Sequence, residues 1–382
     1  MSSSASEPSF TLEILEIFVP LEWAYTANLA KPGAESFDFN SSTSQFLHAD
    51  QLIDLGRQCD AADNDSTIKQ YTLKSLDGQV QKLPLPSLNT SQGRPGTWPL
   101  AYRIAYRNVF QLCLDLKSPF YQGPRIRSAV YIAAEGQRPV VSEPSPDSLG
   151  PQLTEWNKQW HTSQIKKTIT EFLETNVSRM RRVNKVIGLG LGRLCTENSG
   201  DPDGEVSYFQ HLTTQHIAQV LARVQNNTDI ASYVQDPGYT TTSKALTARH
   251  FPEFAIIDDP AAFCLMDKHT IVVQCNMPFG ASEVSLAIAG DDGLAGIICP
   301  PITQDHQTAL VGRQLVKNEQ WRDKDMWYGL RWLCSTKKWE WREWCAEQML
   351  SGAEPWFGWD DEGNSGSVFY VRVYDTGEEK GE

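Results

Sequence analysis

The feature that most constrains the fold is a run of branched apolar residues, Val183–Gly192, which ends in three alternating glycines. Such a run without polar partners is typical of a strand that is buried on both faces, as in a parallel sheet between layers of helices. The glycines Gly188, Gly190 and Gly192 indicate a sharp turn or a close approach of another group. In a doubly wound sheet this position is the carboxyl edge of a strand, where ligands bind.

Apolar strands alternate with helices after this run. We expect helices at 206–225 and 244–250, and strands at 230–235, 254–258, 270–275 and 294–299. Because crossovers between strands of one sheet are right-handed, these strands become parallel neighbours. The order predicts an α/β fold that is Rossmann-like, with a mostly parallel sheet and helices on both faces. Upstream, Leu153–Met180 has apolar residues at helical spacing and is predicted as one long helix.

Two further regions flank the predicted sheet. A Pro- and Ser-rich stretch separates an α+β N-terminal elaboration, residues 1–150, from the Rossmann-like domain with its Trp-rich C-terminal part, residues 151–382. In the elaboration we expect strands at 10–21 and 126–134, helices at 49–57 and 100–116, and a hairpin around Asp77-Gly78. The tryptophans between 321 and 359 predict a helical pair, whose aromatic surface belongs to the core or forms a wall for a planar substrate. A last strand is expected at 368–374.

Composition restricts the possible partners. The net charge of −13 is unsuited to coating nucleic acid with the whole surface, although a local basic patch is compatible with it. No stretch reaches the roughly 20 apolar residues of a membrane helix, and the first ten residues lack the features of a signal peptide. The eight cysteines include no CxxC pair. We therefore expect a cytoplasmic protein without membrane or DNA partners and without a metal site.

A dense group of cations precedes the central strand and is called the basic cluster below. Its members are Lys166, Lys167, Arg179, Arg181, Arg182 and Lys185. A solvated helix face is one explanation of these residues. In a protein of net negative charge, they are also where an anionic partner would dock.

Several residues near the glycine turn could carry nucleophilic chemistry. The candidate nucleophiles are Cys195, Thr196 and Ser199, and the candidate bases on the following helix are His211 and His216. Because the two histidines are five residues apart, they do not share a helix face. One of them could equally be a hydrogen-bonded core histidine.

Carboxylates follow two of the predicted strands. Asp236, Asp258 and Asp259 could bind a cation such as guanidinium, whose paired donors match a carboxylate. The last two could equally belong to a turn before Pro260. A nicotinamide cofactor is not predicted, because the acid of a dinucleotide site follows its glycines by about 20 residues. Asp236 lies 236 − 192 = 44 residues after the last glycine.

Five short motifs, in this order, resemble the SRR1-like family. They are Gly190-Leu191-Gly192 after a strand, Gln215-His216 on a helix, Asp236-Pro237-Gly238-Tyr239, Asp259-Pro260 and Met277-Pro278. The resemblance covers about residues 155–290 and implies a Rossmann-like fold. Arg193 departs from the pattern, since many relatives carry a small hydroxyl residue there.

A fungal branch that resembles this family contains arginine-containing cyclodipeptide synthases. These enzymes join arginine from Arg-tRNA to a second aminoacyl group and close a diketopiperazine ring. The long N-terminal and Trp-rich C-terminal parts make the chain similar to that branch. The implied partners are Arg-tRNA and a second aminoacyl-tRNA, and no cofactor is implied because the esters are already activated. General members of the family imply instead a non-catalytic regulatory protein linked to haem or the circadian clock.

The resemblance to the synthases implies roles for particular residues. The implied catalytic residues are Cys195, Ser199, His216 and Tyr239. The implied substrate-binding residues are Gly190, Gly192, Asp236, Asp258 and Asn276. The glycine-turn amides would stabilise an oxyanion, and the basic cluster would contact the tRNA backbone.

Overall fold

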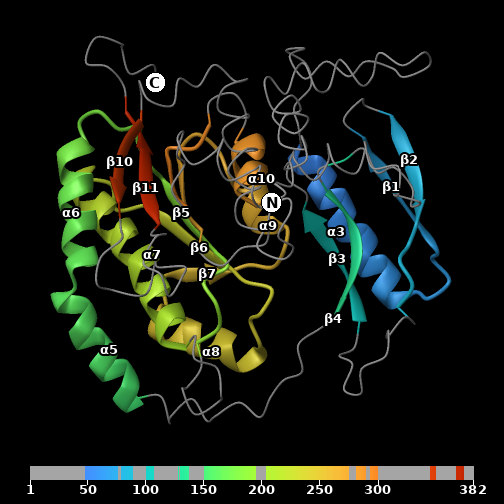
Figure 1. The fold of residues 1–382 in the computed structure, drawn as a ribbon, viewed down its shortest axis with the longest axis horizontal. Coiled ribbons are helices and arrows are strands. Elements are labelled where there is room, and N and C mark those ends of the chain that lie inside the picture. The colour runs from blue at the N-terminus through green and yellow to red at the C-terminus, as the bar shows by residue number, and fades with distance from the viewer. Residues whose placement is uncertain are drawn as a thin grey trace, which may run out of the picture.

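The computed structural model describes residues 48–75, 79–88, 100–106, 128, 130–136, 150–194, 204–274, 281–289, 293–299, 345–349 and 367–373. Among these residues, the largest sheet has seven strands in the order β10-β11-β9-β8-β5-β6-β7 (Figure 1). Its parallel strands are β5 (Lys185–Leu189), β6 (Ala231–Gln235), β7 (Phe254–Ile256), β8 (Thr270–Gln274) and β9 (Gly296–Cys299). The antiparallel strand β11 (Val368–Arg372) lies between β9 and β10 (Cys345–Met349).

The strand order confirms the predicted α/β fold with a mostly parallel sheet. Each strand expected between 183 and 299, and the strand expected at 368–374, corresponds to a strand of this sheet. β6 and β8 pair with opposite sides of β5, so the direction of strand addition reverses at β5. Such a reversal opens a crevice outside the carboxyl ends of the two strands, where doubly wound folds bind ligands.

Helices cover both faces of the sheet, because successive side chains of a strand point to opposite faces. Ile187 and Leu189 belong to one buried cluster, whereas Val186 belongs to the other. The Val186 face is covered by α5 (Gly150–Thr162), α6 (Gln164–Asn176), α7 (Gly204–Val224) and α8 (Thr241–His250). The opposite face is covered by α9 (Ala261–Cys264) and α10 (Ala281–Ile288) (Figure 1).

The single helix predicted over Leu153–Met180 is wrong, because the chain forms α5 and α6 there. Ser163 lies between them with an extended backbone, φ −67° and ψ 145°. Its hydroxyl accepts a hydrogen bond from Lys166 N at 3.2 Å and so caps α6. The apolar face nevertheless runs through both helices, since Trp160 and Ile169 are buried in the same cluster.

The described residues of the N-terminal part form one helix and two strand pairs. They are α3 (Ala49–Asn64), the antiparallel pair β1 (Gln70–Lys74) and β2 (Val80–Pro84), and the antiparallel pair β3 (Leu100–Tyr106) and β4 (Val130–Gly136). The predicted hairpin strands are confirmed, whereas the helix predicted from residue 100 is wrong over β3. The expected strand at 10–21 lies outside the described residues. So does the linker expected at 137–150, except for Gly150, which begins α5.

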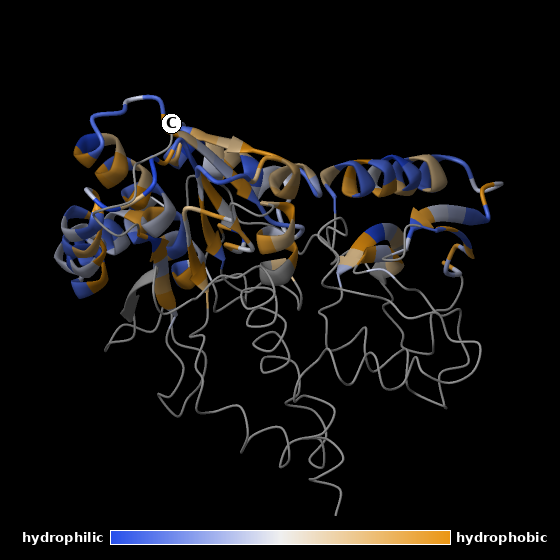
Figure 2. Cartoon of the chain, turned by 90° about the horizontal axis from the view of Figure 1, so that it is seen from above, coloured by the Kyte–Doolittle hydropathy of each residue, from blue (hydrophilic) through white to orange (hydrophobic). Residues whose placement is uncertain are grey.

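The hydrophobic core of the N-terminal part is continuous with that of the sheet. Leu52 and Leu55 of α3 belong to the same buried cluster as Phe263 of α9 and Leu189 of β5. Figure 2 shows mostly hydrophobic strands in the central sheet, while the surrounding helices alternate hydrophobic with hydrophilic residues. The N-terminal elements therefore form a further layer on the side of α9 and α10.

The helical pair expected over 321–359 is wrong at β10, and its tryptophans lie outside the described residues. None of the helices in the described ranges is long and apolar enough to cross a membrane.

Candidate functional site

The candidate site is built around the turn that follows β5. Gly190 and Gly192 have φ angles of 62° and 76°, a region that favours glycine. A Cβ atom at Gly192 would lie 2.1 Å from Ser207 Oγ of α7, so this glycine also lets the turn approach the helix. Gly190 N donates a hydrogen bond to Gln235 O at 2.9 Å, which ties the turn to the end of β6.

Asp236 is fixed directly beside this turn. Gly192 N donates to Asp236 Oδ2 at 2.7 Å, and Gly238 N donates to Oδ1 at 2.6 Å. Two backbone amides therefore orient the carboxylate where β5 and β6 end side by side. The structure thus brings together Gly190, Gly192 and Asp236, three of the predicted substrate-binding residues.

The same bonds argue against the oxyanion role expected of the glycine amides. A backbone amide carries a single N–H donor. The N–H of Gly190 is used by Gln235 O, and that of Gly192 is used by Asp236. These two amides shape the turn and hold the carboxylate.

Next to Asp236, the side chains of His211 and Tyr239 form a hydrogen-bonded pair. His211 Nδ1 lies 2.6 Å from Ser207 O, which can only accept, so Nδ1 carries the proton. His211 Nε2 therefore accepts a hydrogen bond from the Tyr239 hydroxyl at 2.7 Å. Burial lowers the pKa of His211 to about 4, and burial together with Asp236 holds the pKa of Tyr239 well above its ordinary value. Both side chains are therefore neutral at pH 7.

His216 does not join this pair. Its five-residue separation from His211 corresponds to about 140° around an α-helix. His216 Nε2 lies 2.7 Å from Thr170 Oγ1 of α6, and its ring packs edge-on against Trp160. Of the two candidate bases in the sequence, His211 is the one that meets Tyr239, while His216 contacts α5 and α6.

A second polar network lies at the carboxyl end of β6 around Asp259. Gln235 Nε2 and the Tyr106 hydroxyl both donate to Asp259 Oδ1, at 2.9 and 2.7 Å. Gln235 Oε1 accepts from Ala262 N at 3.2 Å. Sequence reasoning missed Gln235 and Tyr106. The position of Gln235 as the last residue of a buried strand was the signal that could have found it.

Asp258 contacts Lys244 rather than either network. It is exposed and pairs with Lys244 Nζ at 2.8 Å. Ala261 N donates to Asp258 O at 2.9 Å, which supports the alternative that Asp258-Asp259-Pro260 forms a turn. Three other predicted site residues, Cys195, Ser199 and Asn276, lie outside the described residues.

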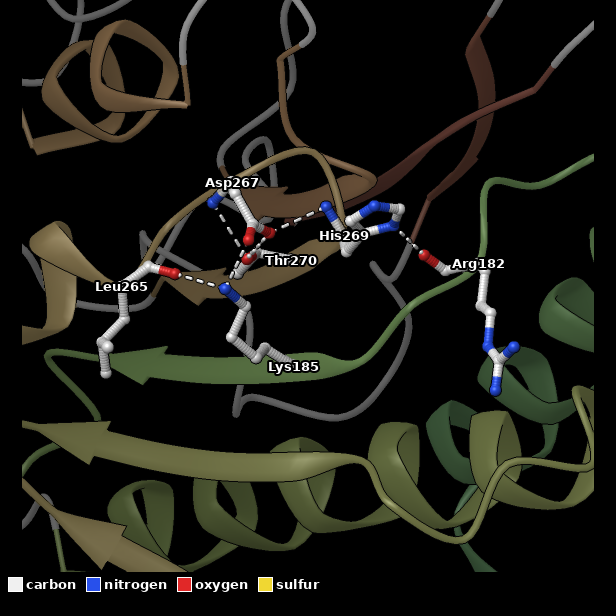
Figure 3. A network of polar contacts seen from close by, with 6 residues as sticks. All are labelled: Arg182, Lys185, Leu265, Asp267, His269 and Thr270. Carbon is white, nitrogen blue, oxygen red and sulfur yellow. Dashed lines mark hydrogen bonds and ion pairs between the residues drawn. The ribbon is translucent and has the colours of Figure 1, made fainter. Parts of the chain in front are cut away.

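The basic cluster does not border the glycine turn. Lys185 is the first residue of β5 and so lies at the opposite end of the strand. Its ammonium donates to Asp267 Oδ2 at 2.6 Å and to Leu265 O at 2.7 Å (Figure 3). With its side chain only 17% exposed, Lys185 neutralises a neighbouring carboxylate. This placement does not favour the predicted contact of Lys185 with tRNA.

The other members of the basic cluster extend from the same edge of the sheet to α6. Figure 3 shows His269 beside Arg182, where His269 Nδ1 donates to Arg182 O at 2.8 Å. Lys167 forms an exposed ion pair with Glu171 within α6. Lys166 lies in the first turn of α6, apart from the arginines. The cluster is therefore divided between α6 and the segment that leads to the amino end of β5.

The chain was compared with models of known protein families, with curated proteins and with solved structures, and none of the three comparisons found a match. The resemblance to the SRR1-like family stays a prediction. Among the described residues, no three His, Cys, Asp or Glu side chains are grouped as ligands of one metal ion.

Proposed function

We propose that the chain is an aminoacyl-tRNA-dependent cyclodipeptide synthase with a Rossmann-like fold, which works at the carboxyl edge of β5 and β6. The observation that carries the proposal is the Asp236 carboxylate, held by the amides of Gly192 and Gly238. In doubly wound folds an acid at the end of the strand beside the glycine turn binds a ribose hydroxyl. The amino acid of an aminoacyl-tRNA is esterified to a ribose. Asp236 is therefore suited to anchor the ester end of the donor.

The same edge is rich in acceptors, which suits arginine as the amino acid. A guanidinium carries only hydrogen-bond donors and prefers carboxylates. Asp236 and Asp259 both lie beside the end of β6, where Gln235 contacts the second of them. The phenol oxygen of Tyr239 is a further acceptor beside Asp236.

The proposed reaction balances without an oxidant or a nucleotide. The amine of the second aminoacyl group attacks the ester carbonyl of the first, so that a C–N bond forms and the C–O bond to the ribose breaks. The proton of the amine passes to the released ribose oxygen. A second attack of the same kind closes the ring and frees the second tRNA. Cys195 or Ser199 would accept the first acyl group if the transfer proceeds through a covalent intermediate.

The test is a reaction of the purified chain with Arg-tRNA and a mixture of other aminoacyl-tRNAs, followed by mass spectrometry of the products. We expect a cyclic dipeptide that contains arginine. Asp236→Asn should lower its yield by about tenfold or more, because a hydrogen bond from a charged group is lost. Asp229→Asn removes the same charge at the exposed amino end of β6 and should leave the yield unchanged. A folded wild-type protein that forms no such product would contradict the proposal.

One observation favours a second function, a non-catalytic regulatory protein that binds a ligand. Asp236, His211 and Tyr239 bind one another or the backbone, and such contacts stabilise the sheet edge without any reaction. Binding of Arg-tRNA without formation of a cyclic dipeptide would support this function. For either function we propose the cytoplasm as the compartment.

A further inference from the structure

A cavity of about 460 Å³ lies between α7 and the junction of α5 with α6, three helices that Figure 1 shows side by side. This volume is typical of sites for small molecules. The cavity is distinct from the glycine turn, since its α7 residues begin at Leu212, whereas the turn approaches that helix at Ser207. Its polar and aromatic lining includes Trp160, His161, Lys166, Gln215, His216 and Arg223.

The charge of the cavity is positive. Lys166 of α6 and Arg223 of α7 contribute two cations from different helices. Among the described residues that line the cavity, none is acidic. In a chain with a net charge of −13, two cations that line one hollow create a local field that attracts anions.

Both cations have contacts that an anion could use or replace. Lys166 Nζ donates to His161 Nδ1 at 3.0 Å, and a ring nitrogen that accepts this bond carries no negative charge. Arg223 Nη2 contacts Glu174 Oε1 at 2.8 Å, but both side chains are more than 40% exposed. Exposed ion pairs contribute little, and a guanidinium has five N–H donors, so this contact does not prevent a second one.

Two further features indicate positive potential in the part of the cavity that contains Lys166 and His216. Lys166 lies in the first turn of α6, where the helix dipole adds partial positive charge. Burial, followed by the charge of Lys166, lowers the pKa of His216 to about 4, and Arg223 acts in the same direction. The fields of both cations therefore reach the ring of His216.

We infer that this cavity binds a phosphate group, with Lys166 and Arg223 as its charged contacts from facing helices. A phosphate has several acceptor oxygens that two separate cations can share, and charge-assisted hydrogen bonds to it are strong. The phosphate could belong to a small compound or to the backbone of an RNA. The inference does not rest on the function proposed for the carboxyl edge.

The test is a titration of the full chain with inorganic phosphate, followed by NMR of ¹³C-labelled histidine rings. We expect saturable shifts of the His161 and His216 resonances. Lys166→Gln and Arg223→Gln should each weaken binding by about tenfold, the loss of one hydrogen bond to a charged group. Circular dichroism checks that each variant is folded.

Lys158→Gln is the matched control. Lys158 is an exposed lysine of α5 that pairs with Glu155 and does not line the cavity. Its substitution removes the same charge and should change phosphate binding by less than about twofold, since exposed charges are well screened. Equal weakening by Lys158→Gln and Lys166→Gln would reduce the effect to net charge and overturn the inference. The absence of a saturable shift in the wild-type chain would also overturn it.

Competition distinguishes the two sources of phosphate. Deacylated tRNA is added to the phosphate-saturated chain, and the same two histidine resonances are followed. If tRNA displaces phosphate from the wild-type chain but not from Arg223→Gln, the ligand is an RNA backbone. Resonances that keep their phosphate-bound positions identify a small phosphate compound. Neither result depends on whether the chain forms a cyclic dipeptide.

Discussion

Tyr239 and His211 are single residues whose contact holds the candidate site together. In Tyr239→Phe the donor to His211 Nε2 is lost, and a buried acceptor is left without it. We expect the free energy of unfolding to fall by about 1–3 kcal/mol. Urea denaturation measures the change. Tyr233→Phe removes the hydroxyl of a partly buried tyrosine of β6 and is the control. Equal effects of the two substitutions would show that the contact with His211 contributes nothing.

The pH dependence of stability also belongs to single residues. Burial lowers the pKa of both His211 and His216 to about 4, from the ordinary value of 6.5. The unfolded chain therefore binds protons at a higher pH than the folded chain does. The contribution to stability is complete above pH 6.5 and is lost progressively as the pH falls from 6.5 to about 4. Urea denaturation at several pH values should show this loss. His216→Gln should make the dependence less steep, and an unchanged profile would contradict the assignment.

Sequence spacing concealed which residues meet at the site. Asp236 lies 44 positions after Gly192, yet Gly192 N donates a hydrogen bond to the Asp236 carboxylate at 2.7 Å. The 21-residue helix α7 accounts for much of that separation, and the parallel pairing of β5 with β6 removes it in space. The contact of Tyr106 with Asp259 joins positions 153 residues apart and follows from no local pattern.

Among the secondary-structure elements, the junction of α5 and α6 depends on one cap. In Ser163→Ala the acceptor for Lys166 N is lost. We expect a cost of about 1 kcal/mol in the free energy of unfolding. Ser178→Ala, at an exposed position after α6, should cost much less. Chemical denaturation measures the free energy of unfolding of both variants. If Ser163→Ala lowers it no more than Ser178→Ala does, the cap is dispensable.

The strands β5, β8 and β9 could be predicted because each is a short run of apolar residues that is buried on both faces. β3 could not, since Leu100–Tyr106 mixes aromatic residues with Arg103 in an order that also suits a helix. These residues form a strand because they pair with β4, whose residues are distant in the chain. The break at Ser163 was hidden for a different reason: the apolar periodicity continues through it.

The whole molecule behaves as one unit if its core is continuous. Leu55 of α3 is fully buried in the cluster that also contains the sheet residue Leu189. Leu55→Ala should cost about 2–5 kcal/mol and lower the stability of the sheet as well as that of α3. Hydrogen exchange of the β5 amides measures this effect. Ile53→Ala alters a 38% exposed residue of the same helix and is the control. Unchanged exchange in β5 would show that the N-terminal part unfolds by itself.

The position of β11 between β9 and β10 has a consequence for synthesis on the ribosome. β9 ends at residue 299, but the strand that pairs with its outer side ends only at residue 372. Until then the outer side of β9 lacks its partner among the described strands, and such an edge is the kind of surface on which other chains add strands. We therefore expect strand addition by another chain at β9 to be a risk that ends only when β11 pairs with it.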